Sequence, residues 1–193
     1  MPSLLSEAAA KLDAWTLTPL AQLSTFQVAY ARYGGTTPTI QLHDRANLGI
    51  ATTPWAPNVY RGTGGEHRVT MTLNVPDSVR EDIELIEERF RDLLRPNVPK
   101  IDAIWHSTTK PGDRYKSTLR AKINISGDKM AKFVDKDGHP TDPPTSWHNL
   151  SVIPILAVRG AYVQKTGAGL MMDVVAVMVG DVQHRKEEDV EFV

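Results

Sequence analysis

Regular alternation of side chains between residues 115 and 125 is the clearest pattern in the chain, and it predicts a β-strand. Tyr115, Ser117 and four aliphatic residues occupy the odd-numbered positions, and polar residues occupy the even-numbered ones. Successive side chains of a strand point to opposite faces, so Lys116, Arg120 and Lys122 are expected on one face. Positions on that face repeat about every 7 Å, which is close to the spacing of phosphates along a nucleic-acid strand.

Five further segments have the composition of strands. Residues 66–75 alternate, with Val69, Met71, Leu73 and Val75 inward. Short β-prone runs at 26–33 and 39–43 are separated by two glycines, and longer runs at 147–163 and 170–179 are joined by a polar, glycine-containing turn. The second of these long runs is almost entirely apolar, as in a strand that is covered on both sides.

One segment, residues 78–95, has helical rather than strand periodicity. Its apolar residues recur at steps of three and four: Val79, Ile83, Ile86, Phe90 and Leu93. Ser78 and Glu81 predict a capping box at its start, and the Arg-Pro pair at 95–96 ends it. We expect this helix to pack against the strands and to have no other role.

Together these segments predict a mainly β protein, with an OB-fold-like small barrel, one intercalated helix (78–95) and a short N-terminal helix or arm. A β-sandwich remains an alternative. The expected organisation is an N-terminal arm or short helix over 1–20, a nucleic-acid-binding domain over 21–182 and a flexible acidic tail over 183–193. A chain of 193 residues is long enough for one domain with a proper core.

The net charge of −1 conceals a segregation of charge along the chain. Residues 187–193 carry four acids and no bases, and residues 77–95 carry seven acids and four arginines. The remainder has 18 bases and 12 acids, a net charge of +6. The sequence therefore indicates a basic body whose negative charge is confined to one helix and one tail.

Several other classes of protein lack support in the sequence. There is no cysteine, no basic signal-peptide start and no apolar run of membrane-spanning length. The Gly-rich segment 62–65 lacks the Gly-Lys-Ser/Thr of a phosphate loop, residues 135–138 begin like a calcium loop without its closing glutamate, and the six histidines show no metal-ligand spacing. We expect no catalytic residues, no metal and no cofactor, with a hydrolase or nuclease as the least favoured alternative.

Three passages, taken in their order and spacing, carry a resemblance to a known family. The first runs from Asn47-Leu-Gly-Ile50 through an aromatic loop to the strand at 69–75 and the helix. The second is the alternating strand followed by Asp135-Lys-Asp-Gly138, and the third comprises residues 152–162, a polar turn, the strand at 170–179 and the acidic tail. Together they span about two thirds of the chain and resemble the single-stranded DNA-binding proteins of large eukaryotic DNA viruses, which are similar in turn to those of short-tailed bacteriophages. The resemblance implies an OB-fold that binds single strands without catalysis in replication or recombination, and a tail that contacts partner proteins.

Such proteins need cations along the backbone track and aromatic faces on which bases stack. The predicted nucleic-acid-binding residues are Trp55, Tyr60, Arg61, Arg68, Trp105, Lys110, Arg114, Tyr115, Lys116, Arg120, Lys122 and Arg159. Alternatives are a merely solvated face for the cations, and core packing for the aromatic rings at 105 and 115. Strict alternation puts Tyr162 on the face opposite Arg159, and the arginine is the preferred contact.

The C-terminal tail is the predicted partner-binding element, through Glu187, Glu188, Asp189, Glu191 and Phe192. The expected partners are single-stranded DNA and replication or recombination proteins, with a homodimer left open and no membrane. The expected location is intracellular and soluble, at a site of viral or cellular DNA replication. The alternative from another class is a viral or cellular structural protein built on a β-sandwich.

Overall fold

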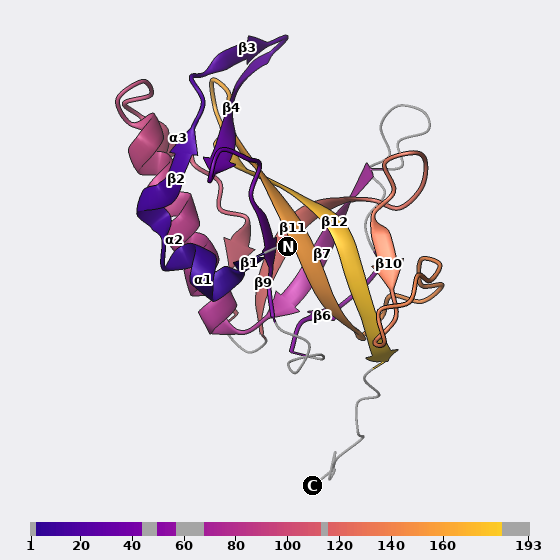
Figure 1. The fold of residues 1–193 in the computed structure, drawn as a ribbon. Helices are drawn as coiled ribbons and strands as arrows, with labels where there is room; N and C mark the ends of the chain where they lie inside the picture. The colour runs from indigo at the N-terminus through magenta and orange to yellow at the C-terminus, as the bar shows by residue number, and fades with distance from the viewer. Residues whose placement is uncertain (1–2, 44–49, 57–67, 113–115, 183–193) are drawn as a thin grey trace, which may run out of the picture.

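The computed structural model describes residues 3–43, 50–56, 68–112 and 116–182 (Figure 1). The first half contains β1 (Ser3–Leu4), α1 (Leu5–Ala9), a 3-10 turn (Leu12–Ala14), β2 (Trp15–Leu17), β3 (Ala21–Leu23), β4 (Phe26–Tyr33), β5 (Thr39–Gln41), β6 (Thr52–Thr53), β7 (Arg68–Val75) and α2 (Asp77–Leu94). The second half contains α3 (Ile101–Ile104), β8 (Thr109–Lys110), β9 (Ser117–Asn124), β10 (Lys132–Val134), β11 (Leu150–Val163) and β12 (Ala168–Val182). No helix in these residues is long and apolar enough to cross a membrane.

Five strands close into a barrel. β6 pairs with β7, β7 with β9, β9 with β12, β12 with β11, and β11 returns to β6. All of these pairings are antiparallel except that of β9 with β12. The prediction of a mainly β, OB-fold-like barrel is confirmed, and the sandwich alternative is wrong because the strands form a closed ring.

The barrel core follows directly from the alternation in the two central strands. β7 and β9 pair in a continuous antiparallel register in which Val69 faces Ile123 and Leu73 faces Leu119. All four of these side chains are fully buried. The polar residues between them therefore point away from the core, as the sequence pattern predicts.

The long strand β11 holds additional strands on its second edge. It pairs in succession with β6, β5 and β4, and β12 pairs with it along its other edge. The register against β12 shifts between Val158 and Gly160. Gly160 has a φ of +141°, and a Cβ there would lie 1.9 Å from the carbonyl oxygen of Ala29. Only glycine permits β4 to approach β11 so closely.

The helix α2 closes one side of the core, but its start differs from the prediction. Pro76 is the N-cap residue and no side chain caps the helix, so the expected capping box of Ser78 and Glu81 is wrong. Instead, Asp77 in the first turn accepts a hydrogen bond of 2.6 Å from the hydroxyl of Ser117. This hydrogen bond is the main reason that the pKa of Asp77 is lowered. The carboxylate also complements the positive end of the helix dipole.

The N-terminus forms the short helix that was one of two alternatives, and it is part of the core. Leu5 and Ala8 of α1 are buried, and Trp15 is fully buried. The Trp15 indole N–H donates to the Ala8 carbonyl at 3.1 Å, and its ring lies 5.8 Å from that of Phe90 in α2. Figure 1 shows α1 alongside α2, away from the β10 side of the barrel.

Candidate nucleic-acid interface

A cationic surface covers the outer face of β7 and β9. Thr70 pairs with Lys122 and Thr72 with Arg120, so even-numbered residues of both strands share that face. Arg68, Arg120 and Lys122 are exposed there, whereas the odd-numbered neighbours are buried. The strand register thus brings Arg68, about fifty residues earlier in the chain, next to the predicted row of cations.

A groove of about 530 Å³ runs over this surface. It is lined by the three cations, by Thr70 and residues 106–108, and by a set of aromatic and apolar side chains from strands β4, β11 and β12. The groove-lining aromatic and apolar residues include Phe26, Tyr162, Leu170, Met171 and Met172. Positive charge and ring surfaces therefore meet in one concavity, the combination that single-strand binding requires.

Two aromatic groove residues are not among the predicted contacts: Phe26, and Tyr162, to which Arg159 was preferred. Tyr162 is half-buried, and its burial raises the pKa of its hydroxyl. The register shift before Gly160 breaks strict alternation in β11, so Tyr162 is not turned away from the groove as alternation predicts. The β-prone run at 147–163 predicted the strand that holds Tyr162, but not the face on which its ring lies. Phe26 is brought in by the pairing of β4 with β11, for which no local signal exists.

The carboxylate of Asp173 in β12 also lies against the basic face. This carboxylate forms ion pairs with Arg68 and with Arg159, the latter with a distance of 3.1 Å. Asp173 pairs in register with Lys122 of β9. The predicted contact Arg159 is therefore linked through Asp173 to Arg68, which lines the groove. Asp173 was not among the predicted site residues.

One wall of the groove, residues 106–108, is anchored on α2 by Glu87. This carboxylate is buried, and it accepts hydrogen bonds from the Trp105 indole at 3.3 Å and from the backbone N–H and hydroxyl of Thr108 at 2.7 and 2.6 Å. Thr108 in turn accepts the backbone N–H of Arg120 at 2.8 Å. Trp105 does not line the groove, and its bond to Glu87 favours the packing alternative over base stacking.

Three other predicted residues lie outside the groove. Lys116 and Lys110 are exposed at the start of β9, where Lys110 pairs with Thr118. They continue the cation row beyond the groove. Trp55 is 48% exposed and follows β6, whose Thr52 pairs with Asn74 at the corresponding end of β7.

Four predicted nucleic-acid contacts and the whole predicted partner-binding tail fall outside the described residues: Tyr60, Arg61, Arg114, Tyr115 and residues 187–193.

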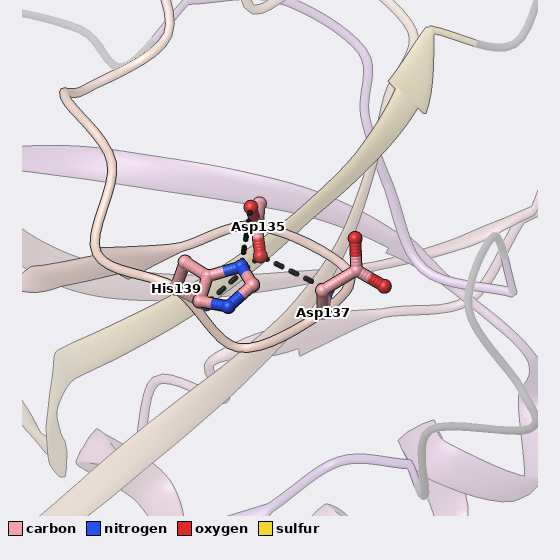
Figure 2. Close-up of side chains that lie close together, drawn as sticks. All are labelled: Asp135, Asp137 and His139. Carbon is pink, nitrogen blue, oxygen red and sulfur yellow. Dashed lines mark hydrogen bonds and ion pairs between the residues drawn. The ribbon is translucent and has the colours of Figure 1, made fainter.

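Within the described residues, one group of metal-ligating side chains lies close together: Asp135, Asp137 and His139 (Figure 2). One Asp135 oxygen accepts the backbone N–H groups of the other two residues, both at 2.9 Å, and the other oxygen lies 3.4 Å from the His139 ring. These bonds lower the pKa of Asp135, led by the backbone N–H of His139. The cluster is accounted for as a side-chain-stabilised turn, in which Gly138 has the positive φ expected of an Asp-Gly turn.

Comparisons with known proteins support the fold. No family model matches the chain, and no curated protein sequence matches it. The gp2.5 single-stranded DNA-binding protein of bacteriophage T7 has a similar structure, with a TM-score of 0.54 and 14% identity over 80% of this chain and 98% of that one. The single-stranded DNA-binding protein of bacteriophage Enc34, solved in complex with single-stranded DNA, has a TM-score of 0.52 and 11% identity over 88% and 97% of the two chains.

These neighbours bear out the phage side of the resemblance seen in the sequence. The likeness extends over almost the whole of each phage protein, so the barrel and the elements around it are shared. At such low identity the comparison establishes the fold and not the site residues. The link to eukaryotic viruses stays a prediction.

Proposed function

We propose that this protein binds single-stranded DNA in replication or recombination, without catalysis, through the groove over β7 and β9. The observation that carries the proposal is the meeting of Arg68, Arg120 and Lys122 with Phe26 and Tyr162 in one concavity. The similarity in fold to two phage single-stranded DNA-binding proteins, one of them in complex with single-stranded DNA, supports it.

The chemistry assigned to the groove is sequence-tolerant. Cations neutralise the phosphates of the backbone, and aromatic rings stack on bases, all of which offer a π-face. Lys110 and Lys116 extend the track beyond the groove at the start of β9. The faces of the bases are open in a single strand and stacked on one another in a duplex, so single strands are preferred to duplex.

The acidic tail is proposed to recruit partner proteins. Phe192 is its aromatic anchor, and Glu187, Glu188, Asp189 and Glu191 supply the charge that recognises a basic partner surface. The same charges compete with nucleic acid for the groove. The place of action is proposed to be an intracellular site of DNA replication.

The test is binding of fluorescently labelled oligonucleotides, measured by anisotropy over a range of salt concentrations. If about four to six phosphates are neutralised, log affinity falls with log salt with a slope of about −3 to −4. Binding is expected to be tighter for single strands than for duplex and nearly independent of base composition. A flat salt response, or tighter binding to duplex, contradicts the proposal.

A pair of triple variants assigns binding to the face. Replacing Lys116, Arg120 and Lys122 with alanine is expected to weaken binding strongly. The matched control replaces three exposed lysines that do not line the groove: Lys129, Lys132 and Lys136. Both variants lose three positive charges, so only the first should bind weakly if the effect is local. Equal effects of the two variants would show that only the overall charge matters.

A further inference from the structure

The carboxylate of Asp173 pairs with two of the arginines on the cationic face. Each of its oxygens contacts a different arginine, Arg68 from β7 and Arg159 from β11. The carboxylate is 18% exposed, whereas the two arginine side chains are 52% and 46% exposed. Within the described residues, no carboxylate forms an ion pair with Arg120. Among the described residues of the face, Arg68 and Arg159 are thus partly neutralised by a carboxylate, and Arg120 is not.

The bonding of the arginines leaves room for a second anion. Arg68 uses Nη2 toward Asp173, and Arg159 uses Nε. A guanidinium has five N–H donors, so each arginine keeps donors that can meet a phosphate. A phosphate that contacts both arginines must nevertheless approach the carboxylate between them, and two like charges at such a distance repel each other.

We propose that Asp173 is a built-in competitor for the phosphates of the bound strand, which deepens and rests on the proposed single-stranded DNA-binding function. In the free protein Asp173 holds Arg68 and Arg159. When a strand binds, the arginines exchange the carboxylate for phosphate. The short aspartate is fixed on β12, in register with Lys122, whereas the long arginine side chains can turn outward.

The exchange has consequences for affinity and salt dependence. Breaking two ion pairs opposes binding, so Arg68 and Arg159 add less affinity than unpaired cations would. Because their charge is already partly compensated, they also release fewer counterions when DNA binds. Asp173 thereby lowers the affinity of the face and keeps the strand easier to displace.

The test is Asp173→Asn, which keeps the shape of the side chain and removes its charge. We expect several-fold tighter binding of a single-stranded oligonucleotide at low salt, and a salt slope steeper by about 0.7 for the one positive charge that is freed. Asp142→Asn is the matched control, because Asp142 is exposed, does not line the groove and changes the net charge equally. The control should bind as the wild type does.

A double-mutant cycle gives a second readout. Arg68→Ala is expected to weaken binding more in the Asp173→Asn background than in the wild type, because Arg68 is then free to contact phosphate. Asp173→Ser repeats the comparison with a smaller side chain, and thermal unfolding checks that each variant is folded. Unchanged binding by both Asp173 variants would overturn the inference. Weaker binding by both would also overturn it, and would show that Asp173 positions the arginines for the strand. If the wild type itself fails to bind single strands, the proposed function fails instead.

Discussion

Replacing Tyr162 with alanine tests whether the aromatic side of the groove binds bases. The ring is half-buried beside the cation row and carries no charge. Loss of one base–aromatic stack costs about 1–3 kcal/mol of binding free energy, or a weakening of about 5- to 150-fold. Because no charge is removed, the slope of log affinity against log salt should stay that of the wild type. A loss of affinity at an unchanged salt slope distinguishes a residue that stacks on a base from one that contacts a phosphate.

The assay is the titration of a labelled oligonucleotide by anisotropy at two salt concentrations. Tyr162→Phe keeps the ring and should bind within about twofold of the wild type, since stacking needs only the π-face. Tyr30→Ala is the matched control, because Tyr30 is an exposed tyrosine that does not line the groove. Thermal unfolding should show a loss of about 1–2 kcal/mol for Tyr162→Ala, since half of a ring is removed from packing.

Two results would refute the reasoning. If Tyr162→Ala binds as tightly as the wild type while remaining folded, no base stacks on this ring. If the affinity falls together with the salt slope, the substitution has disturbed the neighbouring cations and the ring has no separate role.

Three further predictions concern the core, the tail and pH. Leu119→Ala should cost about 2–5 kcal/mol of unfolding free energy in denaturant titrations, because the side chain is fully buried; little effect would contradict the closed barrel. Deleting residues 187–193 should tighten single-strand binding, most at low salt, where competition by the acidic tail is least screened. Phe192→Ala should abolish pull-down of a partner protein and leave the affinity for DNA unchanged. Unchanged affinity of the truncated protein at low salt would show that the tail does not compete for the groove. The hydrogen bond from Ser117 lowers the pKa of Asp77 below 3.8, so its stabilisation is present above that pH and is lost as the pH falls through the lowered pKa. The acid sensitivity of unfolding should therefore decrease in Asp77→Asn, and an unchanged acid transition would contradict this assignment.

The sequence alone determined the elements whose signals are local. The period of two in β7 and β9 places their apolar residues inside, and with them the polar residues on the outer face, because neighbouring side chains of a strand must diverge. The helical period of α2 identified its buried face in the same way, although the start of the helix was displaced to Asp77. The row of cations on the outer face of β9 could be predicted for this reason, since its members are only two or four residues apart in the sequence.

The tertiary structure decided which distant residues share the groove. Phe26 and Tyr162 reach Arg120 only because β4 pairs with β11 and β11 with β12, and the register shift before Gly160 changes which side chains of β11 face outward. Asp173 of β12 forms ion pairs with Arg68 of β7 and Arg159 of β11, which lie far from it in the sequence. Such contacts depend on strand order, register and bulges, which are set by the packing of the whole barrel. A local pattern reveals which face of a strand is polar, but not which strand lies beside it.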